Sequence, residues 1–377
     1  MAEWFQEHYT LLIVILFGLV TIVNIFYYLF VFTKFAFHKP ARIHDIRQDP
    51  VSIVISAKNE AHNLIKSLPH LLSQQYNHYE VVVVNDNSTD ETEQVIRDFM
   101  VKAPHLKLVN LTSSVTNIQG KKFPLSIGIK SAKHEIILLT DADCIPSSPY
   151  WLQNMAKHFR GRTEIVLGYN TYEKRAGLLN KIIRFDNLHN AVQYFSYALI
   201  NSPVAGNGRN LAYTKELFYK NKGFASHNHI KYGEDDIFVN KSANRNNCEI
   251  EYFKGAYTIS RPKSGFANWL SQKKRHTATR RYYKGIHKFL LTLYGLSMPL
   301  FYILLIFCLT INLHNIILFS IILSLFLIKI TFSYVIFGKA AYKLDEKSII
   351  PWILPFDILF SIINPLVYIT SIFSSRR

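Results

Sequence analysis

An apolar run near the middle of the chain ends abruptly at two carboxylates. Residues 136–139 read Ile-Ile-Leu-Leu, and Asp141 and Asp143 follow within four positions. A short bulky apolar run is typical of a buried strand, and residues two apart on extended backbone point the same way. The two carboxylates should therefore converge beyond the strand, which suits a hard divalent cation and a diphosphate-bearing ligand. A solvated turn explains an isolated Asp-x-Asp equally well.

Two earlier apolar runs also end in polar residues. Val51–Ser56 leads into Glu60, and Glu80–Val84 leads into Asp86. Leu106–Asn110 is a third expected strand, and helices are expected near 63–73, 91–100 and 124–131, with Ser88 or Thr89 capping the second. Strands that alternate with helices predict a parallel sheet, whose ligands bind beyond the carboxyl ends of the strands. The polar residues fall at these ends.

Neither of two common nucleotide motifs is present. No GxGxxG follows the first strand, and the chain has no GxxxxGK[ST]. These absences disfavour a dinucleotide-binding domain and a P-loop.

Further polar motifs follow downstream. They are Gly120-Lys121-Lys122, the glycine-rich loop from Gly206 to Tyr213, Gly233-Glu234-Asp235-Asp236 and Gln272-Lys273-Lys274-Arg275-His276. Three successive carboxylates repel one another, so at least one should have a raised pKa unless a cation lies nearby. Glycines let the backbone approach a ligand closely.

Long apolar stretches predict membrane spans. Thr10–Phe32, Phe289–Leu313 and Ile316–Phe337 are each long enough to cross a bilayer. Ile349–Phe373 contains three prolines, so it is expected to be either a span or a re-entrant hairpin. Charges inside such segments are costly, so Lys329 and Asp357 should face protein or water rather than lipid.

Basic residues indicate the orientation of the first span. Before it lie Glu3 and Glu7, and after it lie Lys34, Lys39, Arg42 and Arg47. By the positive-inside rule the N-terminus should lie outside and the central domain in the cytoplasm. Arg376 and Arg377 would break that rule if the last stretch spans.

Composition narrows the possible partners. The 377 residues carry a formal net charge of +17, which invites a nucleic-acid interpretation. The densest basic run, from Lys273 to Lys288, immediately precedes a predicted span, where anionic lipid attracts such segments. We therefore expect membrane anchoring and no nucleic acid. Three cysteines without paired spacing predict neither a disulfide framework nor a zinc site.

Six motifs occur in an order that resembles membrane-bound family-2 glycosyltransferases, such as ceramide glucosyltransferases and cellulose and hyaluronan synthases. They are Ser56-Ala57-Lys58-Asn59-Glu60, Asn85 to Asp90, Gly120-Lys121, Asp141-Ala142-Asp143, Gly233 to Asp236, and Gln272 to Arg275. The resemblance covers about residues 51–276. It implies a GT-A fold, an α/β Rossmann-like mixed-sheet domain, here with one N-terminal and two to three C-terminal transmembrane helices.

The resemblance also implies roles for the donor-side residues. Glu60, Asp86 and Lys121 would contact a UDP- or GDP-sugar, and Asp143, with Asp141, would hold Mg²⁺ or Mn²⁺. Gln272 and Arg275 would contact the diphosphate. Asn85 stands where the family often has aspartate. A turn or cap for Asp86, a first-turn helix position for Glu60 and a solvated loop for Lys121 remain open.

On the acceptor side the resemblance implies a base at Asp235, with Asp236 as second choice and a purely structural helix start as the alternative. Gly206, Gly208, Asn210, Glu234 and His276 are the expected acceptor-binding residues. His276 occupies the tryptophan position of a QxxRW motif, which weakens the sugar-stacking platform of polymerising synthases.

Four regions are expected: residues 1–48 as anchor and basic linker, 49–261 as the cytoplasmic catalytic domain, 262–288 as an amphipathic interfacial segment, and 289–377 as the C-terminal membrane region. The expected function is inverting, metal-dependent sugar transfer to a lipid or lipid-linked acceptor at an integral membrane site, the inner membrane in a bacterium. The alternatives are a processive polysaccharide synthase and a non-catalytic scaffold that binds a nucleotide-sugar or lipid.

Overall fold

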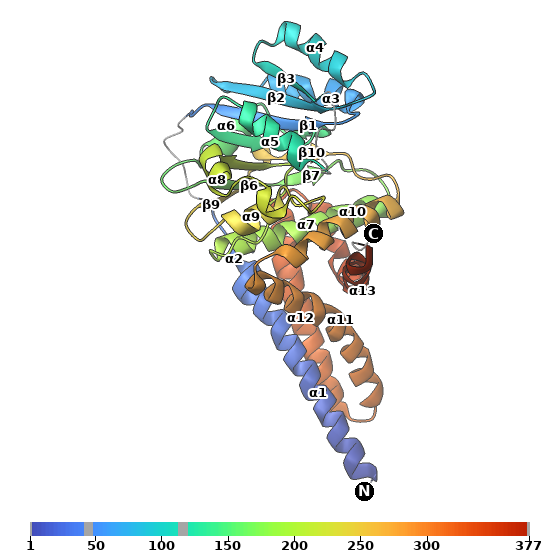
Figure 1. Cartoon of the computed structure of the whole chain (residues 1–377). Coiled ribbons are helices and arrows are strands. Elements are labelled where there is room, and N and C mark those ends of the chain that lie inside the picture. The colour runs from blue at the N-terminus through green and yellow to red at the C-terminus, as the bar shows by residue number, and fades with distance from the viewer. Residues whose placement is uncertain (1, 41–47, 112–119, 375–377) are drawn as a thin grey trace. The chain divides into compact units, whose positions relative to one another are not determined.

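The computed structural model describes residues 2–40, 48–111 and 120–374 (Figure 1). Its contacts divide the chain into two units, one formed by 39–187 and 197–269 and the other by 1–38, 188–196 and 270–377. The interruption at 188–196 is the middle of a long helix, which groups with the apolar helices. Arg42, Arg47, Arg376 and Arg377, which enter the orientation argument, lie outside the described residues.

A mixed seven-stranded sheet forms the core of the first unit, in the order β3-β2-β1-β4-β8-β6-β9. Its strands are β1 (Val51–Ala57), β2 (Tyr79–Asp86), β3 (Leu106–Leu111), β4 (Ile136–Leu139), β6 (Ile165–Gly168), β8 (Leu211–Thr214) and β9 (Cys248–Glu251). The first four run parallel, as expected, whereas β8 is antiparallel to both β4 and β6. The parallel half places the carboxyl ends of β1, β2 and β4 at one edge.

Three helices connect the parallel strands. They are α3 (Ala61–Leu72), α4 (Thr92–Lys102) and α5 (Lys122–Ser131), close to the predicted positions. Leu64, Leu68 and Leu71 of α3 are fully buried, as their spacing along one helix face requires. The predicted caps of α4 are wrong: Asp90, not Ser88 or Thr89, accepts a hydrogen bond from the backbone N–H of Thr92 at 3.0 Å.

The first unit also contains a second sheet of three strands, with further helices and short turns. These strands are β5 (Cys144–Pro146), β10 (Thr258–Ser260) and β7 (Asn170–Tyr172), in that order. The helices are α6 (Trp151–Ala156), α7 (Leu178–Leu199), α8 (Lys215–Lys220) and α9 (Asp236–Ser242), with short 3-10 turns at Ala225–His227 and Lys254–Ala256. β5 begins directly after the Asp-x-Asp, so the chain passes from one sheet into the other at these carboxylates.

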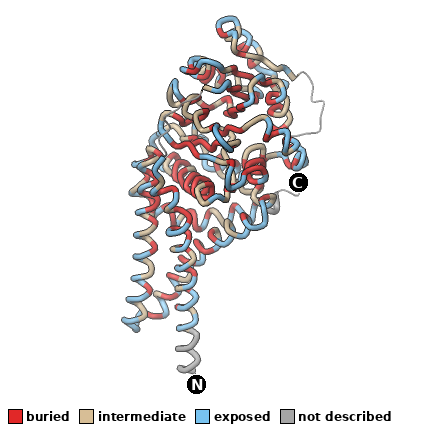
Figure 2. Tube along the Cα trace, turned by 90° about the vertical axis from the view of Figure 1, so that its left-hand side faces the viewer, coloured by how far each residue is buried: buried red, intermediate tan, exposed pale blue. Residues whose placement is uncertain are grey.

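The second unit is built from apolar helices. Its elements are α1 (Ala2–Phe26) with a π-helical turn at Tyr27–Phe32 and α2 (Thr33–Ala36), most of α10 (Phe266–Thr279), a 3-10 turn at Arg280–Tyr282, α11 (Gly285–Ile311), α12 (Ile316–Lys343), a 3-10 turn at Lys347–Trp352 and α13 (Ile353–Ser374). Among the described residues, four stretches are long and apolar enough to cross a membrane: Thr10–Ala36, Gly285–Ile311, Ile316–Lys343 and Lys347–Ser371. Figure 2 shows many exposed residues along α1, and large hydrophobic side chains are among them.

The prolines of the fourth apolar stretch left open whether it is a span or a re-entrant hairpin. Pro355 lies in the first turn of α13, where a missing N–H costs no helical hydrogen bond, and Pro365 lies inside the helix. α13 is nevertheless one helix from Ile353 to Ser374, so the chain makes no hairpin within it.

The two charges within the apolar helices face each other. Lys329 of α12 is fully buried and Asp357 of α13 is 3% exposed, and their side chains form an ion pair. Tyr302 of α11 donates a hydrogen bond to the same carboxylate, and its hydroxyl lies 3.1 Å from the Lys329 amine. The expectation that both charges avoid lipid is confirmed, and one carboxylate joins three helices.

We expect Lys329→Met to destabilise the chain strongly, because it leaves Asp357 buried without its cation. Breaking one partner of a buried pair costs about 3–5 kcal/mol, whereas replacing both is far milder. Thermal unfolding in detergent should therefore rank Lys329→Met below the double variant Lys329→Met/Asp357→Leu. Lys339→Met, at an exposed position of the same helix, is the control. Equal melting temperatures for Lys329→Met and the control would contradict the role of this pair.

Candidate active site

The loops that follow β1 and β2 are locked together by hydrogen bonds. The backbone N–H of Asn59 donates to Ser88 Oγ at 2.9 Å, and Asn59 Oδ1 accepts from the N–H of Thr89 at 2.8 Å. Asp90 Oδ2 accepts from Ala61 N–H at 3.2 Å. Asn59 has a φ of 56°, a left-handed conformation that asparagine tolerates better than most residues. The two strand ends therefore form one polar surface rather than two independent loops.

Glu60 and Asp86 lie on this surface. Glu60 Oε2 accepts a hydrogen bond from Asn63 at 2.5 Å, and burial raises the pKa of Glu60. Asp86 lies 3.8 Å from the Lys58 amine. The turn role considered for Asp86 belongs to its neighbour, since Asn85 Oδ1 accepts the N–H of Ser88 at 3.3 Å. The Asp86 carboxylate is therefore not used by the turn.

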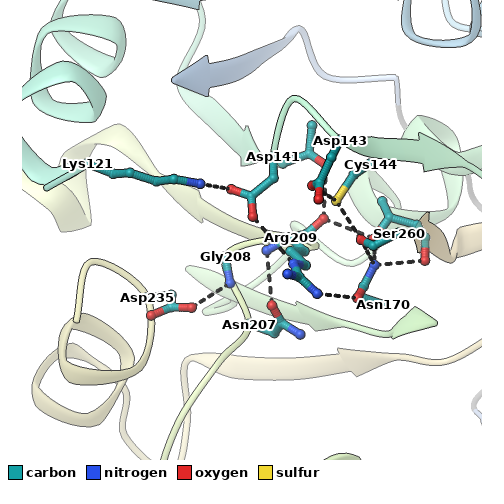
Figure 3. Close-up of polar contacts among 12 residues, drawn as sticks. Lys121, Asp141, Asp143, Cys144, Asn170, Asn207, Gly208, Arg209, Asp235 and Ser260 are labelled. Atoms are coloured by element: carbon teal, nitrogen blue, oxygen red, sulfur yellow. Dashed lines mark hydrogen bonds and ion pairs between the residues drawn. The ribbon is translucent and has the colours of Figure 1, made fainter. Parts of the chain in front are cut away.

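Asp141 is held between two cations. Lys121 Nζ lies 2.6 Å from Asp141 Oδ1, and Arg209 Nε lies 3.4 Å from Oδ2, as Figure 3 shows. Burial alone would raise the pKa of Asp141, but Lys121 and Arg209 outweigh it and hold that pKa at about 2. Asp141 is consequently ionised throughout the neutral range. The Lys121 side chain makes this ion pair while remaining 45% exposed.

Arg209 is a site residue that the sequence analysis missed. Its guanidinium donates to the Tyr172 hydroxyl at 2.8 Å and to Asn170 Oδ1 at 3.4 Å, and it lies 5.3 Å from the Tyr172 ring centre. The Arg209 carbonyl accepts hydrogen bonds from the hydroxyls of Thr140 and Thr258, both at 3.0 Å. Contacts on both its main chain and its side chain fix this cation beside the carboxylate.

Asp143 supplies the second carboxylate of a possible metal site. Ligand atoms of Asp141, Asp143 and Cys144 all lie within 4.8 Å of one another. Cys144 Sγ lies 3.1 Å from Ser260 Oγ, and burial, followed by the charges of Asp141 and Asp143, raises the thiol pKa to about 12. In the absence of a metal the thiol stays protonated at neutral pH, and hard divalent ions prefer oxygen ligands to sulfur. The remaining oxygen donors suit a hard ion such as Mg²⁺ or Mn²⁺.

The glycine-rich loop carries the contact to the second group of carboxylates. The N–H of Gly208 donates to Asp235 Oδ2 at 2.9 Å, as Figure 3 shows. The N–H of Asp236 donates to Asp235 Oδ1 at 2.7 Å. A Cβ at Gly208 would lie 3.2 Å from the Asp235 Cβ, so glycine permits this close approach. Arg209 is the next residue, so the Asp235 contact and the Asp141 contact lie on consecutive residues of one loop.

The three successive carboxylates differ in their surroundings. Asp236 is 7% exposed, and its Oδ1 accepts the N–H of Ile237 at the start of α9. Glu234 Oε2 is buried and has no hydrogen-bond partner among the described residues. Burial and then Asp235 raise the pKa of Glu234 to about 7, although Lys121 opposes the shift. The expectation of one raised pKa in this group is confirmed.

Two expected acceptor-side residues, Gly206 and Asn210, are closely packed against the protein. Asn210 is fully buried and bonds to the Trp151 indole and to the carbonyls of Tyr169 and Ala256. A Cβ at Gly206 would lie 2.9 Å from Val239. These surroundings favour a role in packing the loop over direct contact with an acceptor.

Gln272, Arg275 and His276 lie on α10 and group with the apolar helices. They are therefore not part of the geometry described for the strand-end site. Gln272 is 8% exposed, and the carbonyl of His276 accepts a hydrogen bond from Thr279.

The candidate site combines two groups of residues that are suited to different chemistry. Two cations and two carboxylates at the end of β4 can bind a metal-complexed diphosphate, while Asp235 offers a carboxylate fixed by two backbone N–H groups. Each carboxylate oxygen has a second lone pair, so Asp235 can still accept a proton.

Comparison with known proteins indicates the family of the central domain. Residues 52–204 match the model of the family described as Glycosyl transferase family 2. The chain is similar to a poly-beta-1,6-N-acetyl-D-glucosamine synthase of Staphylococcus epidermidis, 28% identical over 167 residues, which are 43% of this chain and 38% of that protein. Glycosyltransferase AglE of Haloferax volcanii is 29% identical over 143 residues, which are 37% of this chain and 45% of that protein. These matches thus span less than half of either curated relative.

Among solved structures, the mannosyltransferase PcManGT from Pyrobaculum calidifontis, in complex with GDP-Man and Mn²⁺, has a similar fold. The TM-score is 0.57 at 18% identity, and the alignment covers 92% of this chain and 98% of that one.

The raised pKa of Glu234 predicts a pH-dependent stability effect. A carboxyl whose pKa is higher in the folded state favours folding when protonated, so its contribution is lost as pH rises from about 4.5 towards about 7. Glu234→Gln should therefore raise the melting temperature by a few degrees at pH 8 and by much less at pH 5, measured with EDTA present. Glu249→Gln, outside the site, is the control. A Glu234→Gln effect that is the same at both pH values would contradict the assignment.

Proposed function

The chain contains a family 2 glycosyltransferase domain of the GT-A fold, and from this premise we propose that it transfers a sugar, with inversion, from a nucleoside diphosphate to a lipid or lipid-linked acceptor at a membrane. The observation that carries the proposal is the loop Gly208–Arg209. It connects the carboxylate pair suited to a diphosphate-bound metal with a second carboxylate suited to act as base.

On the donor side, Glu60 and Asp86 would contact the base and ribose of a UDP- or GDP-sugar, and Lys121 would reach the nucleotide. Asp143 would be the direct ligand of Mg²⁺ or Mn²⁺, since Asp141 already holds two cations. A bound divalent ion would neutralise charge on the departing diphosphate, an effect worth several kcal/mol. Gln272 and Arg275 would add contacts to the diphosphate, which arginine can bind through two hydrogen bonds.

Asp235 would be the base. It would take the proton of the acceptor hydroxyl as that oxygen attacks the anomeric carbon, and the bond from that carbon to the diphosphate would break on the opposite face. Such a base typically contributes 10² to 10⁴ in rate. Its hydrogen bonds from Gly208 and Asp236 support this role by fixing the carboxylate in place. Glu234 and His276 would lie nearer the acceptor.

Four apolar helices and the basic run before α11 support a membrane-associated acceptor. The basic residues after the first span support a cytoplasmic catalytic domain with the N-terminus outside. A processive polysaccharide synthase is the second candidate, because the Staphylococcus epidermidis relative is named as one. His276 in place of tryptophan favours transfer of a single sugar, since an imidazole stacks less well on a sugar than an indole does.

The function is tested with detergent-purified protein, Mn²⁺, a panel of UDP- and GDP-sugars and total membrane lipid, followed by thin-layer and mass analysis. One sugar added to a lipid supports the proposal. Polymer made from nucleotide-sugar alone would instead identify a processive synthase. Binding of a nucleotide-sugar without any transfer would identify a scaffold.

We expect Asp235→Asn to lower transfer by about 10²- to 10⁴-fold while leaving donor affinity within a factor of two, because the amide cannot take the proton. Binding of the donor is measured by calorimetry and transfer by initial rates. Asp98→Asn, at an exposed position of α4, is the matched control. Full activity in Asp235→Asn would remove Asp235 as the base.

Asp143→Ala is expected to abolish the Mn²⁺-dependent part of donor binding, since it removes the carboxylate that we propose as the direct ligand of the ion. Calorimetric titration of UDP and GDP with Mn²⁺ and with EDTA measures this part directly. If Asp143→Ala binds nucleotide with undiminished Mn²⁺ dependence, the metal does not bind where we propose.

A further inference from the structure

Lys122 is a buried cation whose amine is fully occupied by main-chain carbonyls. The side chain is 1% exposed. Its Nζ donates to the carbonyls of His227 at 2.9 Å and Tyr232 at 2.7 Å, and also to that of Ile230. An ammonium group has three donors and no acceptor, so these three bonds use all of them. No local sequence signal marks Lys122 for this role, because the recognisable motif is carried by the neighbouring Lys121.

All three carbonyls belong to one segment, residues 227–232, which leads directly into Glu234 and Asp235. Leaving three buried carbonyls without donors would be costly, so the amine fixes the path of this segment against the start of α5. The carboxylates of Glu234, Asp235 and Asp236 and the amine of Lys241 are the charged groups that act on Lys122. Burial lowers the Lys122 pKa to about 8 despite the three carboxylates, and at neutral pH the amine remains mostly charged.

Gly120, the residue before Lys121 in the sequence, contacts the same segment. It has a φ of +89°, and a Cβ there would lie 2.2 Å from the carbonyl oxygen of Lys231. A side chain at this position would therefore meet backbone and also impose a strained conformation. Lys121 lies between Gly120 and Lys122 in the sequence, and its amine lies 2.6 Å from the Asp141 carboxylate.

We propose that Gly120-Lys121-Lys122 forms a clasp that sets the position of Asp235 relative to the donor site, with Lys122 as a positioning residue that never touches substrate. The expected effect on kcat rests on the proposed function, whereas the expected effect on the backbone of residues 227–235 does not. Residues 120 and 122 hold the segment that carries the base, and residue 121 holds the carboxylate beside the metal ligand. A displacement of about 1 Å in such a group can cost about 10²-fold in rate.

The structural consequence is tested by hydrogen exchange on ligand-free protein in detergent. Lys122→Met should speed exchange across residues 227–235 and leave the strands β1 and β2 unchanged. Lys130→Met, at the exposed end of the same helix, should match the wild type everywhere. Unchanged exchange across 227–235 in Lys122→Met would overturn the clasp, and so would faster exchange throughout the domain, which would indicate general destabilisation.

The kinetic consequence is tested with the donor that the panel identifies. Lys122→Met should lower kcat by roughly 10- to 100-fold while Mn²⁺-dependent binding of UDP or GDP stays within about twofold. Lys122→Arg keeps the charge and the donors, so it should recover part of kcat, and it replaces Lys122→Met if that variant does not fold. Wild-type kcat in Lys122→Met, or equal loss in both variants, would overturn the positioning role.

The exchange and kinetic experiments together distinguish failure of the clasp inference from failure of the proposed function. If the wild type transfers no sugar from any donor, the proposed function fails, while the exchange experiment still decides whether the clasp exists. If the wild type is active and Lys122→Met is equally active, the clasp inference fails and the proposed function stands.

Discussion

The active-site arrangement depends on the Asp141 carboxylate and the two cations that hold it. Lys121 comes from the start of α5 and Arg209 from the loop before β8, so one carboxylate joins segments that are far apart in the sequence. The two opposite charges keep the pKa of Asp141 at about 2 despite its burial. Because Asp141 is already paired, we propose Asp143 as the direct ligand of a metal ion. Loss of either cation would leave this partly buried carboxylate with only one of its two ion-pair partners.

The same contacts connect the two halves of the site. Arg209 reaches Asp141, while the preceding residue, Gly208, donates its N–H to Asp235. Lys121 reaches Asp141, while the following residue, Lys122, holds the segment before Asp235. Two short segments therefore fix the donor carboxylate and the proposed base together. Positioning by rigid main chain is what group transfer needs, because much of its rate enhancement comes from orientation.

Sequence patterns located the parts of the site that lie at strand ends. The alternation of strands and helices placed Glu60, Asp86 and Asp141 at one sheet edge, since parallel strands share the direction of their carboxyl ends. The same patterns did not identify Arg209 or Lys122, because nothing local distinguishes a buried cation from a solvated one. Their roles come from tertiary partners: Asn170 and Tyr172 for Arg209, and three carbonyls for Lys122. Asn210 shows the converse. As a polar residue in a glycine-rich loop it was expected to bind the acceptor, but it is fully buried.

The central claim is that one metal-dependent donor site lies at the ends of β1, β2 and β4. Its most direct test is an experimental structure of the chain with Mn²⁺ and either UDP or GDP. We expect the ion to contact Asp143 and the diphosphate to lie beside the ion. The nucleoside should contact Glu60 and Asp86. A nucleotide bound away from these strand ends, or an ion that does not contact Asp143, would contradict it.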